Sequence, residues 1–193
     1  MKNCLSASAL LLAAMAAVPA NAAPVAYAID PAHTFPSFEA DHMGISVWRG
    51  KLDRSSGTVM YDKSAGTGTV EIATELASVD FGLDVLAAWA RGEDFFDVKK
   101  YPLAVFKGSL QSPVNGVPTR LVGELTLHGV TRPLTLTVNS LKCIQHPMLK
   151  RDYCGADASG SFNRDDFGLG AGKEYGFKMN VDLRIQVEAI AQP

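Results

Sequence analysis

Strict alternation of apolar and polar residues marks the C-terminal part of the chain. Over residues 181–188 every second residue is Val, Leu or Ile and the others are Asp, Arg, Gln and Glu, which predicts a strand with one dry and one solvated face. The same pattern on both sides of Gly129, at 121–128 and 134–138, predicts a hairpin. Shorter alternating runs lie at 25–29, 37–43, 46–52, 59–61, 69–74, 103–107 and 156–162.

One segment departs from this period of two. Its apolar residues recur at helical spacing, and the predicted apolar face consists of Val85, Leu86, Trp89 and Ala90. We expect a short helix over about residues 83–91, capped by Asp80 and ended by a left-handed Gly92. The paired rings of Phe95 and Phe96 follow directly and need apolar surroundings, which suits a helix that covers the mouth of a barrel. A helix that closes a filled core explains the same pattern.

About eight to ten strands with short connections and one helix argue against a parallel β-α-β arrangement. The sheet is therefore predicted to be antiparallel, and its dry face must pack on another sheet or curl upon itself. An eight-stranded barrel has room inside for side chains or for one small ligand. Alternation alone does not distinguish a barrel from a sandwich.

The first 22 residues have the form of a cleaved secretory signal. Lys2 precedes an apolar run from Leu5 to Val18, and Ala20-Asn21-Ala22 matches a signal-peptidase site. We therefore expect residues 1–22 to be removed and residues 23–193 to form a single exported domain. The net charge of -2 shows no basic excess, which disfavours nucleic acid as a partner.

The cysteines support export. Cys4 leaves with the signal, and only Cys143 and Cys154 remain, within an irregular excursion expected over 141–155. An isolated pair in an exported protein most simply forms a disulfide. Together with His146 the pair could instead supply three zinc ligands, although no fourth ligand is evident.

The sequence contains no convincing catalytic set. The nucleophile elbow G-x-S-x-G and the zinc motif H-E-x-x-H are both missing from it. The acidic pairs 93–94 and 165–166 occur in loop-like contexts, where carboxylates are usually solvated. An exported metal-dependent hydrolase that uses His33, His42 and these loop acids remains one alternative.

Four phrases that occur in order along the chain carry a family resemblance. They are YAIDPAHTFPSFEADHMG at 27–44, EDFFDVKKYPLAVF at 93–106, GELTLHGVTRPLTLTV at 123–138 and NRDDFGL at 163–169. Together they resemble the YceI-like family of lipocalin-like, polyisoprenoid-binding proteins. The resemblance implies an all-β fold, an extended eight-stranded antiparallel barrel with one short helix near its mouth. It also implies an apolar tunnel that holds a long isoprenoid lipid or a quinone tail, with no other cofactor and no turnover.

The resemblance, together with the alternation of apolar and polar residues, implies which side chains line the barrel interior and contact a ligand there. Among them His42 is the chief polar group expected to point inward. The expected contacts are Phe38, His42, Trp89, Phe95, Phe96, Phe106, Leu136 and Leu183. We therefore expect a periplasmic protein that sequesters or carries an isoprenoid-type lipid. The remaining alternative is a stress-related interaction module whose filled barrel binds a membrane redox partner.

Overall fold

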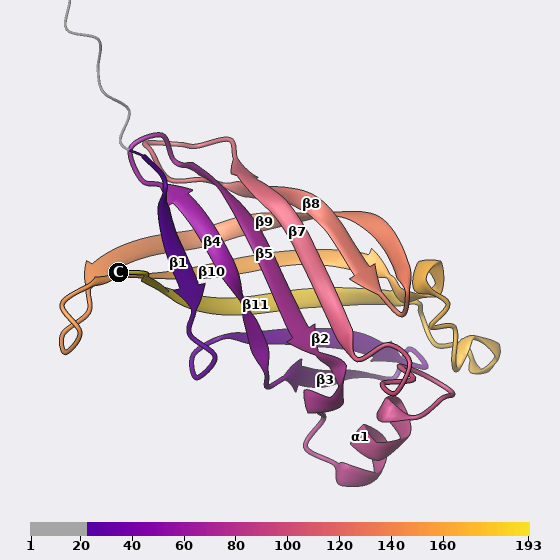
Figure 1. Cartoon of the computed structure of the whole chain (residues 1–193). Coiled ribbons are helices and arrows are strands. Elements are labelled where there is room, and N and C mark those ends of the chain that lie inside the picture. Colours follow the sequence, from indigo (N-terminus) through magenta and orange to yellow (C-terminus); the bar gives the residue numbers. More distant parts are fainter. Residues whose placement is uncertain (1–22) are drawn as a thin grey trace, which may run out of the picture.

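A single twisted antiparallel sheet organises residues 23–193, which are the residues that the computed structural model describes (Figure 1). The strands are β1 (Val25–Ile29), β2 (Phe35–His42), β3 (Ser46–Leu52), β4 (Ser55–Asp62), β5 (Thr67–Glu75), β6 (Val79–Asp80), β7 (Leu103–Gln111), β8 (Arg120–Leu127), β9 (Val130–Gln145), β10 (Asp152–Asn163) and β11 (Asn180–Ala191). The helix is α1 (Asp84–Arg91), and the short 3-10 turns are η1 (Leu76–Ser78), η2 (Arg164–Phe167) and η3 (Lys173–Tyr175). The expected signal peptide and Cys4 lie outside the described residues.

The sheet closes on itself as an eight-stranded barrel. The strands of the barrel follow the order β1-β4-β5-β7-β8-β9-β10-β11, and the last of them, β11, pairs with the first, β1, to close the sheet. Strand β11 is long enough to pair with β1 through residues 189–191 and with β2 through residues 181–186. The break between β1 and β2 follows from Asp30-Pro31, because proline has no backbone N–H for a ladder. Closure decides between the barrel and the sandwich.

Strands β2, β3 and β6 lengthen the barrel wall at one end. Strand β3 pairs with β2 over residues 46–51 and with β6 at Lys51 and Leu52. Helix α1 follows β6 directly, so the chain places the helix beside this lengthened end (Figure 1). The described residues contain no helix that is both long and apolar enough to cross a membrane.

The segment around the cysteines is more regular than the sequence indicates. Instead of an irregular excursion, β9 and β10 form one long hairpin in which Cys143 lies directly opposite Cys154. The predicted disulfide joins them, with the two Cα atoms 4.0 Å apart. Alternation is weak here because most side chains near this end of the hairpin are partly exposed on both faces, so pairing depends on the partner strand.

Helix α1 has nearly the predicted bounds, but its ends differ from the prediction. Leu83 occupies the N-cap position without a side-chain cap, while the Asp80 carboxylate accepts a hydrogen bond from the Gly82 N–H at 2.7 Å. Gly92 has a φ of −71° and is therefore extended and not left-handed. The end of the helix is set by the following chain, whose Phe96 N–H donates to the Ala90 carbonyl at 3.0 Å.

The buried face of α1 is also rotated from the predicted one. Ala87 and Ala90 are buried, whereas Val85 is 70% exposed. Small alanine side chains let the helix backbone approach the barrel closely, and the larger apolar residues are left beside the contact or in solvent. Helical spacing reveals that an apolar face exists, but packing decides which part of it is covered.

The barrel end away from α1 is closed by buried aromatic residues and a polar tie. The Tyr27 hydroxyl donates to the Asp152 carboxylate at 2.5 Å, and Lys63 forms an ion pair with the same carboxylate at 2.7 Å. Burial by itself would raise the pKa of Asp152, but these hydrogen bonds outweigh it and hold that pKa below its ordinary value. Burial and the neighbouring Asp152 raise the pKa of Tyr27.

Candidate functional site

An apolar cavity of about 650 Å³ occupies the interior of the barrel. This volume lies within the range of about 300–1,000 Å³ that is typical of small-molecule sites in proteins. Inward residues of the barrel strands form its wall, and β11 alone contributes Val181, Leu183, Ile185, Val187 and Ala189. The alternation that defines β11 in the sequence therefore also separates the cavity wall from solvent.

The space exists because small residues occupy several inward positions. Ala104 on β7 and Ala156 and Ala158 on β10 line the cavity. Gly108 and Gly123 face each other across β7 and β8, and a Cβ built on Gly123 would lie only 2.6 Å from the Gly108 Cα. The Phe106 ring lies over Gly108, with its Cε1 atom 2.8 Å from the position that a Gly108 Cβ would take, so these glycines make room for a ring of the wall. Inward-phase alanines are visible in the sequence and are the signal that would have located the open space.

The cavity opens at one end, which we call the mouth. Three aromatic residues that line it are also well exposed, namely Trp48 (37%), Trp89 (43%) and Tyr175 (69%), and they lie on β3, α1 and η3. At the far end the lining residues Tyr27, Tyr61 and Leu110 are at most 7% exposed. A long apolar molecule therefore has one route of entry.

Aromatic contacts link the elements around the mouth. Phe38 of β2 meets Phe81, which precedes α1, with ring centroids 5.5 Å apart. Trp48 of β3 meets Phe177 at 6.0 Å, and Trp89 of α1 stacks on Phe95 at 5.0 Å. These contacts join the β2–β3 hairpin to the segment after η3 on one side and to the helical segment on the other.

Arg164 completes this ring of contacts and is the buried charge of the cavity wall. Its side chain donates to the carbonyls of Leu169 and Ala171, the latter at 2.7 Å, and its guanidinium lies 5.7 Å from the centroid of the Phe95 ring. The residue is 7% exposed, and no ion pair among the described residues involves it. Burial lowers the pKa of its guanidinium, but arginine starts so high that it stays protonated.

The buried threonine hydroxyls of the wall already have partners. The Thr34 hydroxyl donates to the Glu188 carbonyl at 3.2 Å and accepts from the Glu188 N–H at 3.1 Å. The hydroxyls of Thr74 and Ser55 lie 3.1 Å apart and bond to each other. The deep wall therefore offers a ligand apolar contact and little else.

The whole barrel corresponds to one known domain. The model of the YceI-like domain matches residues 27–189. The chain belongs to the YceI-like family. A UPF0312 protein of Photorhabdus laumondii is 31% identical over 193 residues, which cover 97% of this chain and 95% of that protein.

Solved structures show the same YceI-like fold at lower identity. BcnA of Burkholderia cenocepacia superposes with a TM-score of 0.66 at 23% identity, over 83% of this chain and 98% of BcnA. A domain from Saccharophagus degradans, described as polyisoprenoid-binding and implicated in plant cell wall breakdown, superposes with a TM-score of 0.63 at 20% identity, over 87% of this chain and 99% of that domain. At these identities the likeness shows the fold alone.

Seven of the eight residues expected to contact a ligand lie on the wall of the YceI-like barrel, namely Phe38, Trp89, Phe95, Phe96, Phe106, Leu136 and Leu183. His42 does not line the cavity. Its ring stacks on Trp48 with centroids 4.2 Å apart and meets Phe177 edge-on at 5.0 Å, so it packs against two residues of the mouth. Ligand contact by the seven wall residues stays a prediction.

Sequence reasoning missed Arg164, the main inward charge. In the sequence it stands between Asn163 and two aspartates and resembles a solvated loop residue. It is buried because the turn η2 folds it under residues 169–171, and no local sequence pattern predicts this contact.

The two histidines of the hydrolase alternative do not come together. His33 precedes β2 and His42 ends it, so the strand separates them by roughly 23 Å at about 3.3 Å per residue. His33 instead bonds to the Asp30 carboxylate at 2.8 Å, and that carboxylate accepts from the Tyr153 hydroxyl at 2.8 Å. The hydrogen bond that His33 donates to the Asp30 carboxylate raises the pKa of His33. This network lies at the surface turn between β1 and β2 and does not line the cavity.

The zinc alternative at the cysteines is likewise replaced by other contacts. Both sulfur atoms are used in the disulfide. The Nδ1 atom of His146 accepts hydrogen bonds from the N–H groups of Met148 at 3.2 Å and Leu149 at 3.1 Å, which fixes the turn of the β9–β10 hairpin.

Proposed function

We propose that this protein binds an isoprenoid-type lipid, with a polyprenyl or quinone tail, inside the barrel and sequesters or carries it without catalysis. The observation that carries the proposal is the apolar cavity of about 650 Å³, closed at the far end and open at one mouth. A filled barrel would serve an interaction module equally well, but it would not retain this space. The description of the Saccharophagus degradans relative as polyisoprenoid-binding supports the same class of ligand.

The wall favours recognition of a long tail over recognition of a head group. Each methylene removed from water contributes about 0.8 kcal/mol, whereas one neutral hydrogen bond contributes about 1 kcal/mol net. Thr34 and Thr74 already bond within the protein, so a ligand gains little by approaching them. Affinity should therefore rise with tail length until the cavity is full.

Arg164, the one buried cation among residues 23–193, suggests how the ligand is oriented. Arg164 lies among the mouth contacts, and the far end is lined by Tyr27, Tyr61 and aliphatic residues. A head group that bears oxygen atoms fits best beside the guanidinium, with the tail directed toward the closed end. Arg164 thereby takes the role that the sequence assigned to His42.

Export to the periplasm belongs to the same proposal. The signal-like residues 1–22 would direct the chain across the inner membrane and leave residues 23–193 as the mature protein. The Cys143–Cys154 disulfide fits an oxidising compartment.

The test is to identify what the natively purified protein contains. The full chain, expressed with its own leader and purified without detergent, is extracted with organic solvent and the extract is analysed by mass spectrometry. We expect a polyprenyl lipid or a quinone in near-stoichiometric amount. An extract without isoprenoid compounds, together with no uptake of added quinones of any tail length, would refute the proposal.

A further inference from the structure

Large apolar side chains are exposed on three separate elements around the mouth. The β2–β3 hairpin exposes Met43 (49%), Ile45 (80%), Val47 (46%) and Trp48 (37%). The start and outer face of α1 expose Leu83 (55%), Val85 (70%) and Trp89 (43%), and η3 exposes Tyr175 (69%). Single exposed apolar residues are ordinary, but a group of them on one end of a molecule marks an interaction surface.

These side chains surround one opening. Trp48, Trp89 and Tyr175 belong both to the exposed set and to the cavity wall. The aromatic contacts from Phe38 to Phe81, from Trp48 to Phe177 and from Trp89 to Phe95 hold the elements together around it. The exposed apolar surface is therefore continuous with the apolar interior.

We propose that the mouth docks on a lipid bilayer and that the hairpin tip, α1 and η3 enter the interfacial layer, so that a lipid passes between membrane and cavity without crossing water. This inference rests on the proposed function, because the cargo must come from a membrane. A bilayer is the occupant that matches a rim of protruding aliphatic tips with tryptophan and tyrosine among them, since Trp and Tyr prefer the membrane–water interface. A flat protein partner would meet only these tips and leave the opening between them uncovered.

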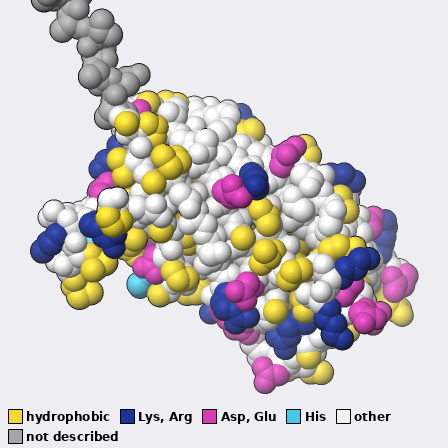
Figure 2. Space-filling model, in the orientation of Figure 1, with side chains coloured by type: hydrophobic (Ala, Val, Ile, Leu, Met, Phe, Trp, Pro, Cys, Tyr) yellow, Lys and Arg dark blue, Asp and Glu magenta, His cyan; other side chains and the backbone are white. Residues whose placement is uncertain are grey.

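Charges at this end carry both signs, as Figure 2 shows over the region of α1. Arg49 pairs with Glu39 at 2.9 Å, Lys178 lies 3.8 Å from Asp41, and Lys173 pairs with Asp165. Cations that are already paired give little attraction to anionic lipids. Arg91, Lys99 and Lys100 near α1 form no ion pair among the described residues, but the same segment, 84–100, carries the four acidic residues Asp84, Glu93, Asp94 and Asp97, so it has no basic excess. Docking should therefore depend on apolar insertion, require no anionic lipid and change little with salt.

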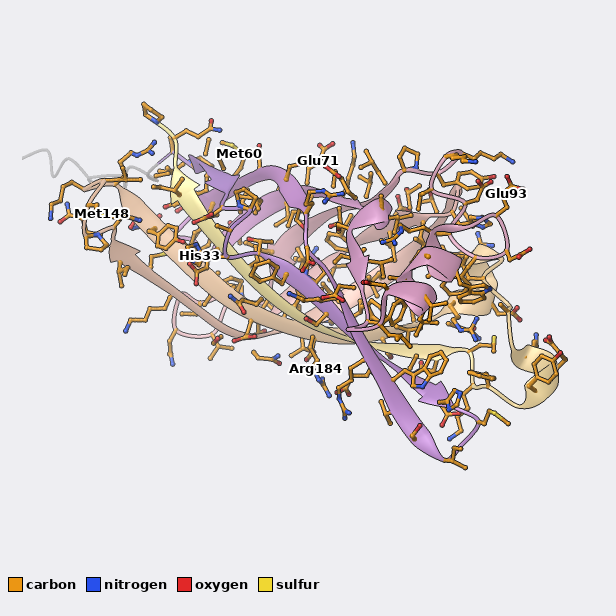
Figure 3. All side chains as sticks on the ribbon, turned by 90° about the horizontal axis from the view of Figure 1, so that it is seen from below. His33, Met60, Glu71, Glu93, Met148 and Arg184 are labelled. Carbon is orange, nitrogen blue, oxygen red and sulfur yellow. A yellow bond between two sulfur atoms is a disulfide. The ribbon has the colours of Figure 1, made fainter. Side chains whose placement is uncertain are left out.

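The opposite end provides a matched control. The β9–β10 hairpin tip exposes Met148 (81%) and Leu149 (53%), and Figure 3 places Met148 at the other end of the barrel from Glu93, which follows α1. The cavity does not open there. Equal aspartate substitutions at the two ends therefore separate docking by the mouth from general stickiness.

The experiment measures co-flotation of the folded mature protein, residues 23–193, with phosphatidylcholine vesicles. The vesicles are prepared with and without phosphatidylglycerol, and each kind is tested at low and high salt. We expect binding in all four conditions. The double variant I45D/V85D should lose binding by more than about tenfold, because aspartate opposes insertion, whereas M148D/L149D should bind like the wild type. Trp48 and Trp89 are the only tryptophans of the chain, so their emission should shift to the blue on docking in the wild type and not in I45D/V85D.

The outcomes separate this inference from the proposed function. Uptake of a quinone tail added from solvent, without vesicles, should be the same in I45D/V85D and in the wild type. Vesicle binding that survives I45D/V85D, that is lost equally in M148D/L149D, or that needs phosphatidylglycerol and low salt would overturn the docking geometry. A vesicle-independent dimer that only I45D/V85D abolishes would assign the surface to a second copy of the chain. Loss of tail uptake in the wild type would instead refute the proposed function.

Discussion

The substitution Ala158→Leu tests whether a lipid tail occupies the cavity. Ala158 is 7% exposed, lines the cavity from β10, and lies between Val138 of β9 and Ile185 of β11. Leucine at this position adds three carbon atoms that point into the open space. Because the backbone is unchanged and the new side chain fills a void, we expect the unfolding free energy without ligand to stay the same or to rise.

The expected loss of affinity follows from displaced tail atoms. If three leucine carbons exclude three tail carbons, the loss is about 2.4 kcal/mol at about 0.8 kcal/mol per methylene. That corresponds to a dissociation constant that is roughly 60-fold larger for tails long enough to reach Ala158. Short tails that end before this point should bind as they do to the wild type.

The assay is a titration of quinones that share one head group and differ in tail length, with protein stripped of lipid. Ala73→Leu is the control, because Ala73 on β5 lies between the lining residues Ile72 and Thr74 and therefore points away from the cavity. We expect Ala73→Leu to bind the series like the wild type. Unchanged affinity of folded Ala158→Leu for every tail length would show that the tail does not occupy this part of the barrel.

Three further predictions concern the wall and its ties. Leu183→Asp should abolish tail binding or folding, because it places a carboxylate in the apolar wall. Arg184→Ala should change the melting temperature little, since Arg184 points away from the barrel (Figure 3). Equal effects of the two substitutions would contradict the assigned faces. Reduction of the Cys143–Cys154 bond, which spans 11 residues, should cost about 3 kcal/mol in the chain-entropy account; coincident urea curves of oxidised and reduced protein would argue against it. The pKa of Asp152 is lower in the folded protein than in the unfolded chain, where an aspartate has a pKa of about 3.9. The ionised carboxylate therefore stabilises the fold at pH values above about 3.9, and this stabilisation is lost as the pH falls from there through the lower folded-state pKa. Asp152→Asn should therefore flatten the acid limb of a stability–pH profile, and a limb of unchanged steepness would exclude this role.

Local patterns in the sequence were sufficient for the strands with one dry face. The alternation over 181–188 predicted β11 and its inner face, and the runs around Gly129 predicted the β8–β9 hairpin. Period-two alternation is a property of neighbouring residues, so it survives without knowledge of the partner strand. The disulfide was also predictable, because the expected removal of residues 1–22 takes away Cys4 and leaves Cys143 with one candidate partner.

The sequence could not show from its periodicity that the sheet closes. Closure requires β1, near the start of the described chain, to pair with β11 at its end, and no local signal joins them. The family resemblance supplied the barrel and the helix near its mouth, and the pairing of residues 27–29 with 189–191 confirms the closed form. The bounds of the β9–β10 hairpin escaped prediction because partly solvated faces blur the alternation.

The candidate site divides in the same way. Apolar wall residues such as Phe106 and Leu136 follow from inward phase on a strand, which the sequence determines by itself. The burial of Arg164 and the position of His42 against Trp48, off the cavity wall, depend on how η2 and the hairpin of β2 and β3 pack at the mouth. The cavity itself also required the tertiary structure, because open space depends on how the inward side chains of different strands, such as Ala104 of β7 and Ala158 of β10, face one another across the closed barrel.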